Sequence, residues 1–361
     1  MRRRVAAGLL LWLVTAAGLR VTLLASESCP PASVAGIDAA VDRAVSWFDA
    51  NELTDGRWRY AVTEDGEVLP GYSIVRHAGV LLALHQAGAP EVAAPGLAWA
   101  QAHLVEHDGW SALADGPDAD IPTGATALLV AALVERDRAG DDRLLRRLGR
   151  FLLVMQRPDG SVLATWDGAT GRPVPGDTSP FFTGEAMWAL ARLEQRFPGE
   201  GWGAASRRTL RYLATARDEV EGRYPLTPDH WGAYGLVETP SLGSPEMAWA
   251  RRLAGAFGVR LRFESQQREE GLVGLVRGGF SMGSAVGTLG EGLGGLWRLA
   301  RREPFLADLR PELEARLTCA AGVLIGRQAG DGAWYADGVT RMDDQQHAIS
   351  ALLLARPAVA G

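Results

Sequence analysis

The 361-residue sequence contains no lysine, and all 37 of its basic residues are arginine. Codon bias in a GC-rich genome would produce the same absence, but the chemical consequence holds whatever its origin. Schiff-base chemistry, pyridoxal-phosphate enzymes and P-loop nucleotide binding all depend on a lysine at a defined position. Those classes of function are therefore excluded.

The sequence also has no basic run beyond residue 20, and its formal net charge is −6. A nucleic-acid groove needs clustered cations to contact the phosphates, so nucleic acid is excluded as a partner. The hydrophobic fraction of 47% and the charged fraction of 22% are ordinary for a folded body with a sizeable core.

Only two cysteines are present, Cys29 and Cys319, and neither belongs to a C-x-x-C pair. This argues against a structural zinc site, and we assign no metal ligands and no cofactor. The two thiols can form one disulfide if the body lies outside the cytoplasm. A free, buried Cys319 inside the apolar run TCAAGVLIG is the alternative, and the sequence leaves both open.

The N-terminus combines a basic start with an apolar run. Arg2, Arg3 and Arg4 precede the apolar residues 5–19, and Arg20 then interrupts the run. An apolar stretch of about 7–15 residues after a basic start is typical of a secretory signal, whereas a spanning helix needs about 20 residues. We expect residues 1–28 to be a signal peptide or membrane anchor and residues 29–361 to form one domain outside the cytoplasm. Whether the segment is cleaved stays open.

From residue 37 onward the chain alternates two kinds of helical segment. One kind is amphipathic, such as AAVDRAVSWFDAN, and suits a helix with one face toward solvent; the other is apolar nearly all round, such as TGATALLVAAL, and suits a buried helix. Six segments are of the buried kind: Tyr72–Leu84, Thr123–Leu133, Gly184–Leu193, His230–Val237, Gly290–Leu299 and Gln345–Leu354. We predict an all-α fold, an (α/α)6 toroid of six helical hairpins with these segments as inner helices.

An open solenoid is the alternative arrangement of six hairpins. Its repeats are usually shorter, about 40–47 residues, and lack long polar connections such as ATWDGATGRPVPGDTSP. Such connections would crowd one end of a closed ring and shape a pocket there. The sequence therefore favours the closed toroid.

A repeated Asp-Gly joint follows four of the charged helical segments. It occurs at Asp55-Gly56, Asp108-Gly109, Asp159-Gly160 and Asp331-Gly332. Glycine there takes the left-handed conformation that ends a helix, and aspartate favours the turn. We expect the trailing Trp58, Trp110 and Trp334 to pack between neighbouring hairpins.

The last joint resembles the repeats of the terpenoid-cyclase and prenyltransferase toroids, in which a glutamine and a Gly-x-Trp close each outer helix. Gln328, Gly332 and Trp334 match that pattern, and Gln156 and Gly160 match it in part. The layout of residues 36–356 is also similar to the six-hairpin glycosidase superfamily, which includes epimerases, uronyl hydrolases and lyases. The resemblance implies the toroid fold and a substrate pocket at its mouth.

The sequence departs from the terpenoid pattern at the positions that carry its chemistry. The nearest string to the Asp-x-Asp-Asp acid is Asp118-Ala119-Asp120-Ile121, which lacks the final pair. The zinc ligands of the protein prenyltransferases have no counterpart. These departures favour a carbohydrate substrate over a prenyl one.

Polar residues interrupt the starts of the buried segments, where a closed ring would bring them to one mouth. Buried charges are unfavourable unless they are paired, so these residues require an explanation. Tyr72 lies one turn before Arg76; Arg76 is a candidate for binding a sugar or carboxylate, and His77 a candidate acid or base. Alternatively, Arg76 pairs with a carboxylate of a neighbouring hairpin and His77 is a core residue.

Two further segments hold candidate acids and bases. In MDDQQHA, Asp343 or Asp344 shares a helix face with His347, which would tune a catalytic histidine or hold half of a metal site. Capping of the last helix by either aspartate is the alternative. Glu185 in TGEAMWALARL is a candidate acid or base for glycosidic chemistry, or simply a first-turn charge.

The segment PDHWGAYGL places an acid, an imidazole and a flat apolar surface side by side, and that surface can stack on a sugar or fill the core. A glycine-rich stretch before the fifth buried segment is expected to place Phe280 and Met282 near the mouth. The candidate catalytic residues are His77, Glu185, His347 and Asp344, and the candidate substrate-binding residues are Tyr72, Arg76, Asp120, Asp229, His230, Trp231 and Glu291.

Together these features favour a carbohydrate-active enzyme of the cell envelope that hydrolyses, cleaves by elimination or epimerises a glycan held in the toroid mouth. A non-catalytic envelope protein that binds a glycan or a partner through the same mouth is the alternative. A membrane-associated terpenoid cyclase is a third reading, which an aromatic content of 7% supports little.

Overall fold

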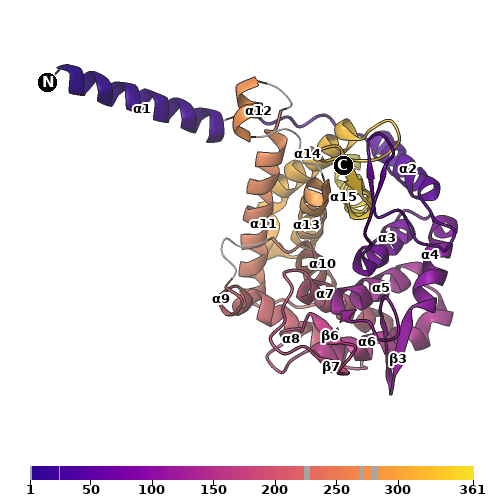
Figure 1. The fold of residues 1–361 in the computed structure, drawn as a ribbon. Helices are drawn as coiled ribbons and strands as arrows, with labels where there is room; N and C mark the ends of the chain where they lie inside the picture. Colours follow the sequence, from indigo (N-terminus) through magenta and orange to yellow (C-terminus); the bar gives the residue numbers. More distant parts are fainter. Residues whose placement is uncertain (1, 24, 223–227, 269–270, 278–282) are drawn as a thin grey trace.

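The computed structural model describes residues 2–23, 25–222, 228–268, 271–277 and 283–361 (Figure 1). In these ranges, six buried helices form an inner ring and six others surround it. The inner helices are α3 (Ile74–Gln86), α5 (Thr123–Arg136), α7 (Phe182–Arg196), α10 (His230–Glu238), α13 (Gly283–Arg302) and α15 (Met342–Ala360). The outer helices are α2 (Val34–Ala50), α4 (Pro90–Ala102), α6 (Asp142–Met155), α8 (Trp202–Thr215), α11 (Ser244–Ser265) and α14 (Arg310–Arg327).

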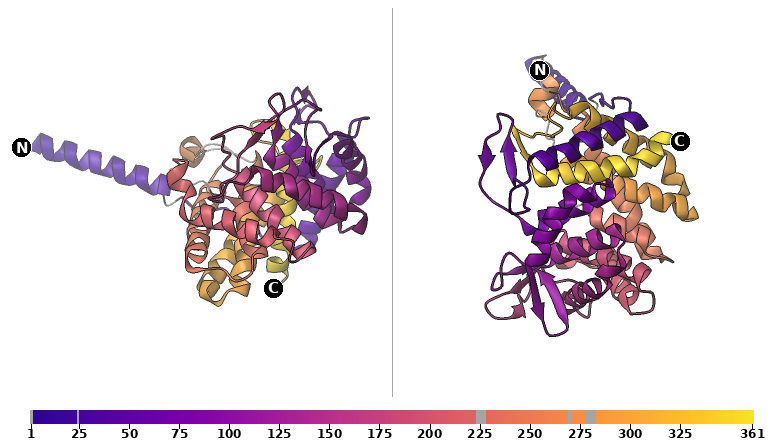
Figure 2. Two further views of the ribbon diagram at one scale, coloured as in Figure 1. Left: turned by 90° about the horizontal axis from the view of Figure 1, so that it is seen from below. Right: turned by 90° about the vertical axis from the view of Figure 1, so that its right-hand side faces the viewer.

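The ring of inner helices is closed. Each packs against the next, in the order α3, α5, α7, α10, α13 and α15, and α15 packs in turn against α3. The first and last hairpins are also joined by strand pairing, because β1 (Ala61–Thr63) runs antiparallel to β8 (Val339–Arg341) with Val62 opposite Thr340. Figure 2 shows α2 lying along α15 at this closure. The helical toroid predicted from the sequence is therefore confirmed.

The all-α prediction missed short strands in the connections from outer to inner helices. Besides β1 and β8, these are β2 (Val68–Leu69), β3 (Leu104–His107), β4 (Trp110–Leu113), β5 (Ile121–Pro122), β6 (Thr165–Asp167) and β7 (Arg172–Pro173). They form two three-stranded sheets and one hairpin. Strands this short leave no recognisable alternation in the sequence, which explains why they were not predicted.

The four Asp-Gly joints adopt the predicted left-handed turns. Their glycines, at positions 56, 109, 160 and 332, have φ values of 89°, 85°, 93° and 94°. At Gly332 the absence of a side chain also permits a close contact with α2, because a Cβ there would lie 2.4 Å from the carbonyl oxygen of Arg43. The last joint is thereby pressed against the first outer helix.

Glutamines at the ends of outer helices make the same kind of connection. Gln328 Nε2 donates to the carbonyl oxygen of Ala40, 2.8 Å away on α2, and Gln156 Nε2 donates to that of Ala205, 2.8 Å away on α8. Trp58 is fully buried against Gly96 of α4. Each joint therefore fastens one outer helix to the next, in keeping with the resemblance to the toroid repeats.

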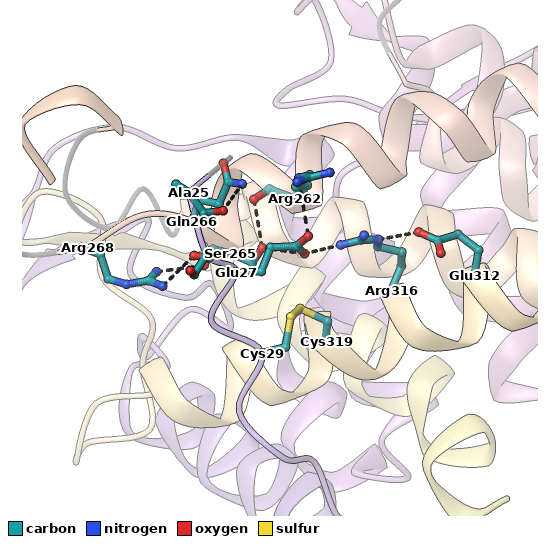
Figure 3. Close-up of polar contacts among 11 residues, drawn as sticks. Ala25, Glu27, Cys29, Arg262, Ser265, Gln266, Arg268, Glu312, Arg316 and Cys319 are labelled. Carbon is teal, nitrogen blue, oxygen red and sulfur yellow. Dashed lines mark hydrogen bonds and ion pairs between the residues drawn. A yellow bond between two sulfur atoms is a disulfide. The ribbon is translucent and has the colours of Figure 1, made fainter. Parts of the chain in front are cut away.

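An extended strap, residues 25–29, crosses α11 and α14 before the first outer helix (Figure 3). Glu27 forms ion pairs with Arg262 and Arg316, and a disulfide joins Cys29 to Cys319. The sequence left this disulfide open, and the structure contains it. The bond ties the strap to α14 over a sequence separation of 290 residues.

Helix α1 (Arg2–Leu23) projects away from the toroid and contacts α12 (Gly271–Arg277) (Figures 1 and 2). Leu11 and Trp12 on this helix are 69% and 66% exposed. None of the helices within the described residues combines the length and the apolar composition needed to cross a bilayer. The predicted membrane anchor is thus not supported.

We expect Gly332→Ala to destabilise the fold more than Gly109→Ala. Both glycines have positive φ, which costs an alanine about 1–2 kcal/mol. Only Gly332 also faces a neighbouring backbone oxygen, whereas a Cβ at Gly109 would meet nothing within 4 Å. The Gly332 variant should lose about 1–3 kcal/mol more in free energy of unfolding, measured by urea denaturation. Equal losses would contradict the close contact that joins the last hairpin to the first.

Candidate functional site

A cavity of about 490 Å³ opens where the inner helices begin. All six inner helices contribute to its wall, so it is the mouth of the toroid. The lining residues are Tyr60, Ser73, Val75, Arg76, Leu128, Phe181, Phe182, Glu185, His230, Trp231, Thr288, Asp343, Gln346 and His347.

A buried carboxylate on α13 lies between two histidines of this wall. Glu291 Oε2 is 2.5 Å from His347 Nδ1 on α15 and 3.8 Å from His230 Nε2 on α10. Tyr234 donates its hydroxyl proton to Glu291 Oε1 at 3.1 Å. The two imidazole rings lie 5.1 Å apart between centroids and are almost perpendicular. Two histidines thus face one another beside a single carboxylate.

The environments of the two histidines shift their pKa values in opposite directions. Burial lowers the pKa of His230 well below its ordinary value, and the neighbouring His347 adds to that effect. Burial also opposes the charged form of His347, but the carboxylates of Glu291, Asp343 and Asp344 outweigh it and raise the pKa of His347. This arrangement favours the neutral form of His230 and the protonated form of His347.

Glu185 on α7 is a second titratable group of the cavity. Its side chain is 3% exposed, and its Oε2 atom has no hydrogen-bond partner among the residues that the structure describes. Burial, together with the nearby Asp229, raises the pKa of Glu185 to about 8. At neutral pH the group is therefore protonated and able to donate a proton.

Asp229 contacts residues that do not line the cavity. It caps α10 by accepting the N–H of Gly232 at 2.8 Å, and it pairs at 2.7 Å with Arg217 of α9 (Arg217–Val220). The predicted substrate-binding residue thus holds the start of α10 in place.

Arg76 and Asp343 form an ion pair on the opposite wall. Arg76 Nε is 3.0 Å from Asp343 Oδ2, and its guanidinium also donates to the hydroxyl of Tyr60. Asp343 Oδ1 is buried and has no hydrogen-bond partner within the described ranges. This pairing with a neighbouring hairpin is the alternative that the sequence left open for Arg76, and both residues line the cavity together with Trp231.

Two predicted site residues, Tyr72 and His77, lie in the aromatic core and not at the cavity. Tyr72 Oη is 2.5 Å from His77 Nδ1, and His77 Nε2 is 2.8 Å from the carbonyl oxygen of Gly96 on α4. Burial beside Trp58 lowers the pKa of His77 to about 4. Consecutive helical residues point about 100° apart, so Arg76 reaches the cavity while His77 faces the outer helix.

Two predicted acids also lie elsewhere. Asp120 is exposed and accepts the N–H of Gly168 at 3.1 Å. Asp344 accepts the N–H of Arg341 at 2.8 Å and so caps α15, and burial beside Asp343 raises its pKa to about 7. Phe280 and Met282, expected near the mouth, lie outside the described residues.

Several residues of the site were not predicted. Tyr234 follows His230 by one helical turn, so its spacing could have indicated the contact with Glu291. Phe181, which is 38% exposed at the cavity, and Tyr60 come from connections whose path the sequence does not fix.

Glycines on neighbouring inner helices make room for the polar side chains. A Cβ at Gly287 would lie 2.6 Å from the Cβ of His347, and a Cβ at Gly124 would lie 2.2 Å from Glu185 Oε2. At these two contacts the inner helices approach closely because the position that faces the polar side chain is a glycine.

We expect Glu185→Gln to stabilise the protein at alkaline pH. The folded pKa of about 8 exceeds the ordinary value of 4.5, so the native state retains a proton that the unfolded chain loses. The contribution of Glu185 to the free energy of unfolding is therefore fully present below pH 4.5. It falls as the pH rises toward 8, by about 1.4 kcal/mol for each pH unit, which amounts to several kcal/mol. Unfolding free energies between pH 5 and 8 should decline less in Glu185→Gln than in the parent.

The matched control for that measurement is Glu91→Gln, which alters an exposed glutamate in the first turn of α4. Its pH dependence should equal that of the parent. A Glu185→Gln variant with the parent's pH dependence would show that Glu185 is ionised in the native state.

This chain resembles known proteins in its fold but not in its sequence. No family model matches the chain, and no curated protein matches its sequence. A family 76 glycoside hydrolase from Bacteroides thetaiotaomicron superposes with a TM-score of 0.61 at 12% identity, covering 89% of this chain and 78% of that one. A cellobiose 2-epimerase from Spirochaeta thermophila gives 0.59 at 12% identity, covering 91% and 97%.

A type II terpene cyclase from Scytonema is equally similar, with a TM-score of 0.59 at 12% identity over 90% of this chain and 99% of that one. Identities this low relate the proteins through their architecture alone. The chain has the α/α toroid fold that six-hairpin carbohydrate enzymes share with terpene cyclases.

Proposed function

We propose that this protein is a carbohydrate-active enzyme that removes a proton from the carbon beside the carbonyl of a small sugar and returns one to the same or the neighbouring carbon, as epimerases and isomerases do. In this proposal His230 is the base and His347 is the acid. The observation that carries it is the pair of buried imidazoles, with opposite pKa shifts, whose ring centroids lie 5.1 Å apart at the toroid mouth.

The chemistry follows from the two protonation states. Epimerisation removes a proton from the carbon beside a carbonyl and returns one to the other face of that carbon, and isomerisation returns it to the neighbouring carbon. A neutral imidazole accepts the first proton, and an imidazolium supplies the second. Pairs of titratable groups whose surroundings separate their pKa values are typical of acid–base catalysis. A module that only binds a glycan has no need of such a separation.

A polyhydroxylated ligand also suits the unpaired polar atoms around the cavity. Glu185 Oε2, Asp343 Oδ1 and His230 Nε2 are buried without hydrogen-bond partners among the described residues. Buried polar groups are nearly always satisfied, and sugar hydroxyls both donate and accept. The volume of about 490 Å³ suits a small molecule, and Trp231 and Phe181 offer apolar surface to a sugar ring. A D-mannose isomerase and a cellobiose 2-epimerase share the fold.

The test is exchange of solvent deuterium into reducing monosaccharides and disaccharides. Exchange at the carbon beside the carbonyl should fall by about 10²–10⁴ in His230→Ala and in His347→Ala, because each loses one proton-transfer group. His107→Ala, at an exposed histidine, should match the parent. Absence of exchange with every sugar, or exchange that survives in both variants, would rule out this function.

Glycoside hydrolysis is a second candidate, favoured by the protonated Glu185. Glu185 would act as the acid and Asp343, paired with Arg76, as the base or nucleophile. Hydrolysis would release new reducing ends without carbon-bound deuterium. It would be lost in Glu185→Gln and Asp343→Asn but retained in His230→Ala, so the same set of variants separates the two candidates.

The position of the body outside the cytoplasm is part of the proposal. A basic start before an apolar run is typical of export, and the Cys29–Cys319 disulfide is typical of oxidising compartments. A C-terminal alkaline phosphatase fusion should therefore be active in bacterial cells, and replacing residues 2–20 with a polar linker should abolish that activity. An inactive fusion to the full chain would place the body in the cytoplasm.

A further inference from the structure

We propose that His230, Glu291 and His347 form a binding site for a divalent transition-metal ion such as Zn²⁺. Two imidazoles and one carboxylate are the protein ligands of several catalytic zinc sites, in which a fourth position is left for water or substrate. Here the three side chains come from α10, α13 and α15, which pack against one another in the inner ring.

The ligand atoms are gathered in a small volume. His230, Glu291 and His347 each offer one ligand atom, and these three atoms all lie within 4.8 Å of one another. Bonds of about 2.0–2.2 Å in a tetrahedral site place ligand atoms about 3.3–3.6 Å apart. The Glu291–His347 distance of 2.5 Å must therefore open by about 1 Å, and the Glu291–His230 distance of 3.8 Å needs only a slight closure.

An unpartnered nitrogen points to the missing ligand. His230 is 3% exposed, and its Nε2 atom has no hydrogen-bond partner in the part of the chain that the structure describes. The nearest acidic oxygen, Glu291 Oε2, lies beyond hydrogen-bond range at 3.8 Å. A buried imidazole nitrogen is rarely left unsatisfied, and metal coordination through its lone pair would satisfy it.

The carboxylate of Glu291 is oriented to coordinate an ion between the two histidines. Tyr234 donates to Glu291 Oε1 at 3.1 Å, which leaves Oε2 directed at the two imidazoles. Hydrogen bonds of this kind fix the orientation of metal ligands and contribute to affinity. His230 and His347 line the cavity, so the open coordination position would face a ligand in the toroid mouth.

A second group with suitable atoms, Glu27 with Cys29 and Cys319, does not compete in the oxidised protein. Its two sulfur atoms are joined in the disulfide and offer no thiolate. The metal site does not depend on the proposed proton transfer, because binding is measured without a sugar. A bound ion would occupy the nitrogen lone pairs that proton transfer uses.

The experiment is a titration of the oxidised full-length chain, stripped of metal by a chelator, with Co²⁺ followed by displacement with Zn²⁺. We expect one Co²⁺ per chain, with visible absorption bands of a low-symmetry nitrogen–oxygen site. The affinity for Co²⁺ should fall by at least about tenfold in the three ligand variants, His230→Ala, His347→Ala and Glu291→Gln. It should fall by about tenfold in Tyr234→Phe, which keeps all three ligands but loses the hydrogen bond to Glu291. His107→Ala should bind as the parent does.

Circular dichroism identifies any variant that fails to fold, and Tyr234→Phe keeps the test decisive if a ligand variant does so. Absence of stoichiometric binding to the parent would overturn the proposal. Binding of equal affinity in folded ligand variants and in Tyr234→Phe would overturn it as well, since the ion would then lie elsewhere.

Discussion

The close approach of the inner helices is the constraint on which the site depends. Helices this near to one another leave no room for side chains on both sides of a contact, so glycine faces several of the buried polar groups that the ring accommodates. Gly124 faces Glu185, Gly184 faces Asp229 and Gly287 faces His347, each with a hypothetical Cβ within 2.2–2.6 Å of its neighbour. The packing that excludes water also shifts the pKa values of these groups, because a charge in a dry site is stabilised only by a specific partner.

Glu291 shows how one such partner organises the mouth. Its carboxylate is fully buried and is held by Tyr234 on one side and His347 on the other. Against the effect of burial, the charges of Glu291, Asp343 and Asp344 favour the protonated form of His347, whereas burial and then the neighbouring His347 disfavour a proton on His230. Different surroundings thereby give two chemically identical side chains opposite pKa shifts. The same donor set would serve a metal ion, so protons and metal would compete for the same lone pairs.

Much of the fold could be predicted from the sequence, because helical periodicity and the Asp-Gly joints are local signals. The six buried segments correspond to the six inner helices, and the left-handed glycines lie where the joints indicated. The site was less predictable, because its membership depends on the direction of each side chain. Arg76 and His77 are adjacent in the sequence, yet only Arg76 reaches the cavity. The strap and its disulfide depend on contacts between distant segments, for which no local signal exists.

The protonation of the two histidines is the most direct test of this account. Nitrogen-15 NMR of the histidine side chains across a pH titration reports the protonation state of each ring, with His230→Gln and His347→Gln to assign the signals. The account predicts that His347 titrates above the ordinary histidine value and that His230 stays neutral at neutral pH. Two rings that titrate together near the ordinary value would contradict it, because no acid–base pair would then exist at the mouth of the toroid.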